Sequence, residues 1–256
     1  MANITQSEIR QYVEKNIQSF HDARIKSLSA LRLGRVLKKK NPYLFKAKNV
    51  VAPRDLVKAL LDAYLSSQEE AILGGFLEGL AVFICSKVYG GRKSTSEGVD
   101  LEFERDGVLC IVSIKSGPSW GNSSQIKAMR ANFASAIKRY KQNKQGLKIE
   151  AINGCCYGRQ QRKSESKGDY TKLCGQRFWQ FVSGDSELYT RIIEPLGHRA
   201  KERNDFFQTQ YELVIDAFTQ EFRRDFCDPS NNVLWKKLAQ FTSAEVPPKL
   251  SRKAKQ

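Results

Sequence analysis

The sequence has few of the features that mark secreted, membrane-spanning or zinc-binding proteins. No apolar run approaches the ~20 residues of a membrane span, and the polar start, MANITQSEIRQY, does not resemble a secretory signal. The six cysteines include no CxxC pair, and neither of the two histidines lies near Cys155, Cys156 and Cys174. Because that spacing fits no common zinc pattern, we expect reduced thiols in a cytoplasmic protein with no membrane partner.

Acidic residues are also scarce, with 27 Asp and Glu against 43 Lys and Arg, which gives a net charge of +16. The excess is uneven, because residues 115–177 contain 14 basic and 3 acidic side chains. A basic surface that served solubility alone would not cluster in this way. The distribution favours a polyanionic partner, which is usually nucleic acid or an anionic membrane surface.

The apolar periodicity predicts long helices before the first strands. Residues 3–37 have helical spacing, and Pro53 opens a second helical stretch. Ser66 and Glu69 form a plausible capping box for a following helix that is apolar almost all round, which predicts that this helix is buried. Glu78 lies in the middle of that apolar segment.

Two strand-like segments follow, VDLEFE (99–104) and VLCIVSIK (108–115), and Asp106-Gly107 between them is a strong hairpin signal. The loop SGPSWGN then precedes a helix that Asn122 or Ser123 can cap. GLKIEAINGCCYG predicts a third strand, Arg159–Tyr170 a polar surface loop, and the segment from Gly175 to Phe241 mainly helices.

The predicted hairpin gathers polar side chains on one face. With Asp106 and Gly107 as turn residues, Asp100 lies opposite Ser113 and Glu102 opposite Ile111. Side chains alternate along a strand, so one face carries Asp100, Glu102, Ser113 and Lys115, while the other carries Leu101, Phe103, Val112 and Ile114.

Two neighbouring carboxylates repel each other, and a bound cation relieves that repulsion. Hard oxygen ligands on a rigid strand suit Mg²⁺, which commonly takes one or two carboxylates. An adjacent lysine can hold a water molecule or a phosphate oxygen. These are the requirements of metal-assisted phosphodiester hydrolysis.

The order of these residues resembles a known family pattern. Asp100, a hairpin and Ser113-Ile114-Lys115 are similar to the D…(D/E)-x-K motif of the PD-(D/E)XK nuclease superfamily. Glu78 and Gln125 lie where many members have a glutamate and several branches a glutamine. IKSGPSWGNSSQ, CCYGRQ and GQRFWQFVSGD resemble bacterial type II restriction endonucleases, a likeness that extends roughly from Gly74 to Trp235.

One position departs from the superfamily pattern. Ser113 stands where an acidic residue is expected two positions before the lysine, which makes this an S-x-K variant. No acidic residue occurs between Lys115 and Glu150, so the helix after the lysine cannot restore the second carboxylate. Glu78 or Glu102 must then supply it, and a lone glutamate in an apolar helix needs a partner.

The resemblance implies an α/β fold with a restriction-endonuclease-like core: a small mixed sheet flanked by helices, with helical additions at both ends. We expect one nuclease domain over residues 1–243, followed by a basic tail over 244–256. Within it the expected parts are a helical part (1–50), a catalytic core (55–157) and a mainly helical part (175–243).

The same resemblance implies Mg²⁺-dependent, sequence-specific cleavage of double-stranded DNA that leaves 5′-phosphates. A homodimer is expected because palindromic targets present a site twice, and a cognate DNA methyltransferase is expected in the same organism. Asp100 would ligate the metal with Glu78 and the Ile114 carbonyl, while Lys115 would position or activate the water. Glu102 and Gln125 are further catalytic candidates, and the candidates for DNA contact are Ser116, Ser119, Asn122, Lys127, Arg130 and Arg159.

Other interpretations remain open. Lys115 could protect an edge strand, Glu78 could form an ordinary salt bridge, and Gln125 could cap its helix. The two isolated histidines argue against histidine-based nuclease chemistry. A repair or recombination nuclease of the same superfamily is an alternative, and Ser113 also permits a catalytically degenerate DNA-binding protein.

Overall fold

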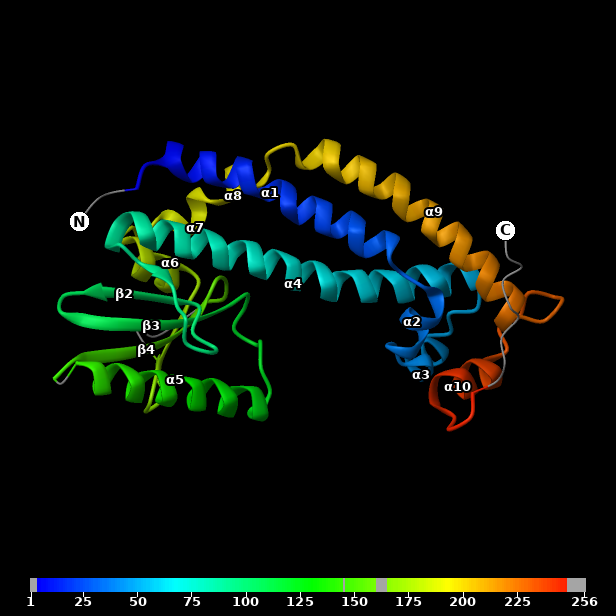
Figure 1. Ribbon diagram of the computed structural model, residues 1–256. Helices are drawn as coiled ribbons and strands as arrows, with labels where there is room; N and C mark the ends of the chain where they lie inside the picture. Colours follow the sequence, from blue (N-terminus) through cyan, green and yellow to red (C-terminus); the bar gives the residue numbers. More distant parts are fainter. Residues whose placement is uncertain (1–3, 145, 160–164, 248–256) are drawn as a thin grey trace. The chain divides into compact units, whose positions relative to one another are not determined.

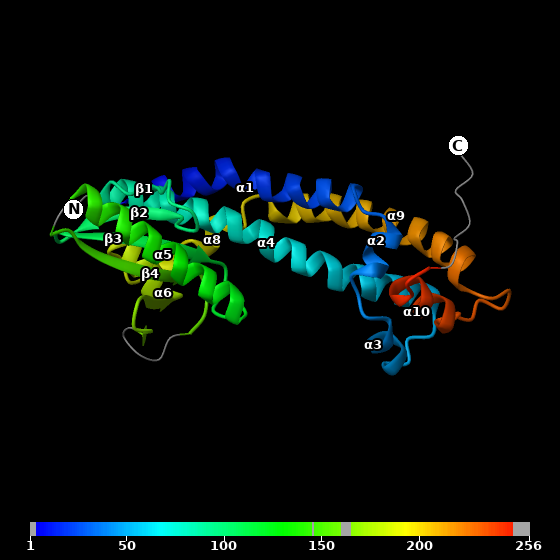
Figure 2. The ribbon, with the colours of Figure 1, turned by 60° about the horizontal axis from the view of Figure 1, so that its bottom comes forward.

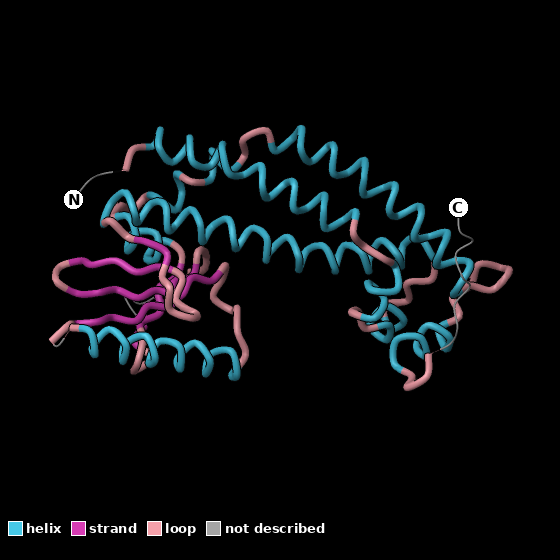
Figure 3. Tube along the Cα trace, in the orientation of Figure 1, coloured by secondary structure: helices cyan, strands magenta, loops and turns pink. Residues whose placement is uncertain are grey.

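The computed structural model describes residues 4–144, 146–159 and 165–247, and ten helices and six strands lie within them. Figures 1 and 3 show the elements along the chain. The helices are α1 (Gln6–Ser29), α2 (Leu33–Lys38), α3 (Pro42–Ala47), α4 (Pro53–Tyr89), α5 (Ser123–Asn143), α6 (Gln176–Ser183), α7 (Leu188–Arg191), α8 (Ile193–Leu196), α9 (Ala200–Phe226) and α10 (Trp235–Ser243). The strands are β1 (Arg92–Lys93), β2 (Leu101–Arg105), β3 (Val108–Lys115), β4 (Lys148–Cys155), β5 (Glu165–Ser166) and β6 (Thr171–Cys174).

The strands form one mixed sheet in the order β1-β2-β3-β4-β6-β5. β3, β4 and β6 are parallel, while β1, β2 and β5 pair antiparallel with their neighbours. Glu102 pairs with Ile111, as the sequence predicted. Asp106 and Gly107 have φ values of 53° and 72°, and a two-residue turn with positive φ at both positions matches the twist of a hairpin.

Helices cover both faces of the sheet, as Figures 1 and 2 show for α4 and α5. Leu101, Phe103, Val112 and Ile114 pack in one cluster with apolar residues of α1, α4 and α6. Residues of the opposite face, including Ile111, pack against Met129, Phe133 and Ala136 of α5. The alternation read from the sequence therefore holds along the paired residues, and Glu102 lies on the α5 face. The ladder begins at Leu101 opposite Val112, and the Asp100 N–H donates to the Val112 carbonyl, so the predicted pairing of Asp100 with Ser113 lies outside the ladder. The predicted α/β fold, a small mixed sheet flanked by helices, is confirmed.

The chain forms two compact units, one from Met1–Phe20 with Ala71–His198 and one from His21–Glu70 with Arg199–Gln256. The whole sheet belongs to the first unit. The second unit is helical and has its own core, in which Leu56 and Leu61 of α4 pack with Ile215 and Phe222 of α9. A single nuclease domain over residues 1–243 stays a prediction, and most of the predicted basic tail, residues 248–256, lies outside the described residues.

Two predicted boundaries were wrong. The helix expected over residues 3–37 is interrupted, because α1 ends at Ser29 and α2 begins at Leu33. The capping box expected at Ser66 and Glu69 does not form, because α4 runs unbroken for 37 residues through both positions. No proline or glycine lies between Pro53 and Glu69, so propagation of the existing helix past Ser66 costs less than starting a new one.

The short strands were missed. β1 and β5 have two residues each and β6 has four, which is too short for an alternating pattern to be visible in sequence. β5 lies inside Arg159–Tyr170, which we expected to be a loop; residues 160–164 of that loop lie outside the described residues.

α4 has an unusual composition for a helix of this length. Within the described residues it alone is long and apolar enough to cross a membrane, with a mean hydropathy of 1.7 in its most apolar window. Core helices of soluble proteins satisfy the same criterion. Leu80, Ile84 and Cys85 are fully buried in the core beside the sheet, but only 33% of the most apolar window is buried, so the prediction of a buried helix holds for part of α4.

The burial pattern predicts unequal costs for two matched substitutions in the first unit. Ile84→Ala removes a side chain that is 0% exposed and should lower the free energy of unfolding by about 2–5 kcal/mol. Ile193→Ala removes one that is 66% exposed and should change it by less than about 0.5 kcal/mol. Urea unfolding followed by circular dichroism measures both, and equal midpoints would contradict the packing described here.

Candidate active site

Asp100 and Lys115 meet at the open end of the β2–β3 hairpin. The Lys115 Nζ lies 3.7 Å from the Asp100 Oδ2, and the two side chains are 29% and 21% exposed. The Ile114 N–H donates a hydrogen bond of 2.6 Å to the same Oδ2. A main-chain donor on a central strand therefore fixes the carboxylate, and the ammonium group neutralises part of its charge.

The strand geometry also directs a carbonyl toward Asp100. The Asp100 N–H donates to the Val112 carbonyl at 2.8 Å, so the main-chain groups of Val112 face β2. The groups of alternate residues in a strand face the same neighbour. The Ile114 carbonyl therefore faces the β2 side. It lies two residues beyond Val112, which is the partner of Leu101, the first residue of β2. Among the described residues no side chain or N–H contacts the Asp100 Oδ1.

The loop after β3 lies beside Lys115. Trp120 and Asn153, which were not identified from the sequence, hold this loop in place. The Lys115 Nζ lies 5.3 Å from the centre of the Trp120 ring, within the range of a cation–π contact. The Trp120 Nε1 donates to the Asn153 Oδ1 at 3.1 Å, and the Asn153 Nδ2 donates to the Ser113 carbonyl at 3.3 Å. Asn153 is only 1% exposed and its hydrogen bond to Ser113 is buried, so losing that bond would be costly, whereas the bond from Trp120 is partly buried.

Three polar residues lie side by side on the neighbouring strands β3, β4 and β6, next to Lys115. Ser113 pairs with Asn153 on β4, and Asn153 pairs with Lys172 on β6. The Lys172 Nζ donates to the Pro118 carbonyl at 2.8 Å, which fastens the loop after β3 a second time. The signal in the sequence was a single asparagine inside the apolar strand KIEAINGC, although its register with Ser113 was not visible there.

Glu102 is occupied elsewhere on the hairpin. It is 5% exposed and accepts hydrogen bonds from the Arg92 Nε at 2.7 Å, from the Ser94 Oγ at 3.0 Å and from the Tyr140 hydroxyl. Burial alone would raise the pKa of Glu102, but the hydrogen bonds from Tyr140, Arg92 and Ser94 outweigh it and hold the pKa below the ordinary value. The side chain thus joins β1, β2 and α5.

Glu78 lies on the other face of the sheet, on α4. Its Oε1 is 3.4 Å from the Lys93 Nζ, and the side chain is partly exposed. Burial and then the Glu78 carboxylate raise the pKa of the Cys156 thiol to about 12, which places Glu78 near the end of β4. Within the described chain Glu78 makes no ion pair with Lys115, and no three His, Cys, Asp or Glu side chains are grouped to hold a metal.

The other predicted site residues lie around the loop and α5. Asn122 caps α5 by accepting from the Gln125 N–H at 3.0 Å, and the Asn122 N–H donates to the Gln125 Oε1 at 3.0 Å, so both belong to a capping box. Arg130 contacts Asp169 at 3.4 Å and the Lys167 carbonyl at 3.3 Å. Ser116 packs closely enough on α4 that a Cβ at Gly74 would come within 3.3 Å of it. The side chains of Ser119, Lys127 and Arg159 are exposed.

The protein thus has an α/β fold, and an acid–lysine pair, Asp100 and Lys115, lies at the end of the central strand β3. The family model of type II restriction endonuclease EcoO109I matches residues 7–204, more than half of the chain. This protein therefore belongs to the family of type II restriction endonuclease EcoO109I, which makes it a nuclease whose substrate is DNA. A comparison with curated proteins gave no match.

Glu102 should make the stability of the fold sensitive to acid. Its lowered pKa means that the unfolded chain binds a proton more readily. The stabilisation is complete above the unfolded value of about 4.5 and is lost as the pH falls through the lower folded value. Glu102→Gln should therefore flatten the acid side of a stability profile, measured as urea midpoints between about pH 3 and 6.

Glu104→Gln provides the control, because Glu104 lies on the same strand and is exposed. It should leave the acid side of the profile unchanged. If the two variants gave the same profile, the hydrogen bonds to Glu102 would not be responsible for the acid sensitivity.

Proposed function

We propose that this protein is a Mg²⁺-dependent endonuclease that cuts double-stranded DNA at a specific sequence and leaves 5′-phosphates. The observation that carries the proposal is the group formed by Asp100, the Ile114 main chain and Lys115 at the open end of the hairpin. It matches the chemistry of the PD-(D/E)XK superfamily in its S-x-K form. Membership of the restriction endonuclease family supports the same assignment.

The donor set suits a hard divalent cation. The Asp100 Oδ1 and the Ile114 carbonyl would hold it, while water molecules and a DNA phosphate oxygen would complete the octahedron that Mg²⁺ prefers. When bound, the cation supplies charge neutralisation at the phosphate. The Ile114 N–H keeps the Asp100 carboxylate oriented in its absence, because it bonds the other oxygen of that group.

Lys115 would act on the attacking water and the phosphate. Its ammonium group is 3.7 Å from the nearest Asp100 oxygen, longer than a strong hydrogen bond, so its protons remain available to a ligand. Trp120 limits its motion from one side. A water held there attacks phosphorus in line, the bond from phosphorus to the 3′ oxygen breaks, and the phosphate stays on the 5′ end.

The second carboxylate would come from Glu78 rather than from Glu102. Glu102 is buried and accepts three hydrogen bonds within its own network. Within the part of the chain that the structure describes, Glu78 forms one ion pair, a partly exposed contact with Lys93 that a cation and DNA could replace. If Glu78 bound the cation only weakly, the protein could bind DNA without cutting it. The experiments below distinguish these two functions.

DNA would lie along α5, which carries exposed basic side chains, and along the polar loop that precedes it. Lys127 is exposed there, and Arg159 is exposed near the end of β4. Contacts with phosphates of this kind position a duplex without reading its sequence. We further propose a homodimer acting on a palindromic target, a partner methyltransferase that protects the host DNA, and a cytoplasmic location, which suits the free thiols.

Digestion of a phage genome tests this function. The purified protein with Mg²⁺ should give discrete fragments, and Asp100→Asn and Lys115→Met should each slow cutting at least about 100-fold. Both variants should still shift the DNA in a gel, because neither change removes the basic α5 surface. Asp106→Asn is the matched control, since Asp106 lies at the exposed turn of the same hairpin and should leave the rate unchanged.

The alternatives give different patterns. A smear in place of discrete fragments would indicate a repair or recombination nuclease. Binding without cutting in Mg²⁺ or Mn²⁺ would indicate a degenerate DNA-binding protein, and equal rates for wild type and Asp100→Asn would reject the hairpin site altogether.

Glu78 should affect the metal requirement. Glu78→Gln removes the charge but keeps the shape, so the Mg²⁺ concentration for half-maximal cutting should rise about tenfold or more, as for loss of a ligand-supporting group. Glu102→Gln should leave that concentration unchanged at a temperature where the protein is folded. Titration of Mg²⁺ against cleavage rate measures both, and the reverse result would assign the second carboxylate to Glu102.

A further inference from the structure

Two segments that the hairpin site does not use meet in space. Tyr157 and Arg159 follow β4, and Gly175 and Arg177 follow β6. Together with α4, α6, α7 and α8 they line a cavity of about 610 Å³ within the first unit. That size lies in the range of roughly 300–1,000 Å³ that is usual for small-molecule sites. These segments, CCYGRQ and GQRFWQFVSGD, stood out in the sequence without a role in catalysis.

The cavity adjoins the end of the catalytic strand. The Tyr157 N–H donates to the Ser116 carbonyl at 3.1 Å, one residue after Lys115. A Cβ at Gly117 would overlap the Tyr157 ring, so this ring packs directly on the loop after β3. In α/β folds ligands bind beyond the carboxyl ends of parallel strands, and the cavity lies at the ends of β4 and β6.

The lining combines aromatic and cationic groups. Tyr157, Tyr189 and Ile193 are exposed although they are large and apolar, and all three border this cavity. Arg159 and Arg177 are exposed beside them. None of the described residues in the lining is acidic. Aromatic faces stack on bases and guanidinium groups bind phosphates, so the lining suits a nucleotide.

The walls are fixed by close backbone packing. Gly175 has φ +52°, and a Cβ there would lie 2.5 Å from the Gly158 carbonyl oxygen. Gly158 has φ +115°, and a Cβ there would lie 2.8 Å from Pro118. Glycine is therefore needed at both positions. The Trp179 Nε1 donates to the Cys156 carbonyl at 2.8 Å, which ties α6 to the end of β4.

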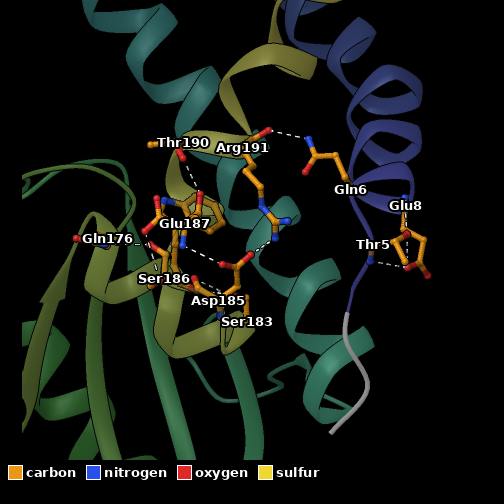
Figure 4. A network of polar contacts seen from close by, with 11 residues as sticks. Thr5, Gln6, Glu8, Gln176, Ser183, Asp185, Ser186, Glu187, Thr190 and Arg191 are labelled. Carbon is orange, nitrogen blue, oxygen red and sulfur yellow. Dashed lines mark hydrogen bonds and ion pairs between the residues drawn. The ribbon is translucent and has the colours of Figure 1, made fainter.

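A polar network holds the wall that carries Tyr189, as Figure 4 shows. The Gln176 Nε2 donates to the Ser186 carbonyl at 3.0 Å, and the Glu187 N–H donates to the Asp185 Oδ1 at 2.9 Å. Arg191 forms an ion pair with Asp185, and the Gln6 Nε2 donates to the Arg191 carbonyl at 3.0 Å. The segment between α6 and α7 is thus anchored on α1 before any ligand arrives.

We propose that this cavity receives one unpaired nucleotide of the bound DNA, with the base against Tyr157 and Tyr189 and the phosphate at Arg159 and Arg177. The proposal rests on the proposed function, because it takes the DNA to lie over Lys115 beside the cavity. An uncharged protein segment would suit the apolar side chains but would leave the two guanidinium groups without an anionic partner, which a nucleotide supplies. A free mononucleotide shares the chemistry of the site and is separated from DNA by the experiment.

Fluorescence anisotropy with a labelled oligodeoxythymidine tests the proposal, using the full chain and Ca²⁺ in place of Mg²⁺ to prevent cutting. The same oligonucleotide with abasic positions keeps the phosphates and removes the bases. The wild type should bind the thymidine strand about tenfold more tightly than the abasic strand, as stacking on aromatic side chains would give. Tyr189→Ala should remove that difference, and Arg177→Gln should weaken both strands equally.

Tyr43→Ala is the matched control, because Tyr43 is an exposed tyrosine of the other unit, and the discrimination should persist in it. Competition by thymidine monophosphate at micromolar concentration would assign the cavity to free nucleotides and overturn the DNA proposal. Equal binding of both strands by the wild type, or discrimination that survives Tyr189→Ala, would also overturn it.

Cleavage of phage DNA by the same preparations separates this proposal from the function on which it rests. Discrete fragments without base discrimination would reject the cavity alone. Base discrimination without cutting would reject the nuclease function and leave the nucleotide site in place.

Discussion

The hydrogen bond from the Ile114 N–H to the Asp100 carboxylate is the contact on which the site depends. It exists because β2 begins one residue after Asp100, so that β3 extends past its partner and leaves main-chain groups without a ladder partner. Because the short strand ends beside a longer one, the Ile114 N–H has no ladder partner on β2 and is satisfied instead by the Asp100 side chain. Lys115, one position further, shares the same overhang and faces the same carboxylate.

The two glutamates show how surroundings assign different tasks to the same side chain. Glu102 is buried beneath α5 with three donors, and its lowered pKa follows from those donors. Glu78 lies near the opposite face with one weakly held partner. A fully satisfied carboxylate stabilises a fold, whereas a loosely held one can respond to a ligand. Because of that contrast, the proposed chemistry is assigned to Asp100 and Lys115 on the hairpin and to Glu78 on α4, and not to Glu102.

The sequence predicted the hairpin register, the polar face and the capping of α5, because strict alternation, an Asp-Gly turn and an asparagine before a helix are local signals. It did not predict Asn153 or Trp120, whose contact depends on how β4 pairs with β3 and on how a loop folds back. β1, which brings Arg92 and Lys93 to the two glutamates, is two residues long and could be found only through its pairing with β2. The continuity of α4 was not predicted, because Ser66 and Glu69 match a local capping signal although no glycine or proline separates them from Pro53.

The two ends of the hairpin differ in what they can tolerate. The open end, which carries Asp100 and Lys115, is crowded by Trp120, Asn153 and the loop after β3. The turn at Asp106-Gly107 is exposed, and a Cβ at Gly107 would meet nothing within 4 Å, but the φ of +72° at Gly107 would strain any other residue there. A dye attached to the exposed side chain at position 106 would leave Gly107 unchanged and would sit on the same hairpin as Asp100 and Lys115. Energy transfer between this dye and a second dye on the DNA would then report how closely a duplex approaches the hairpin.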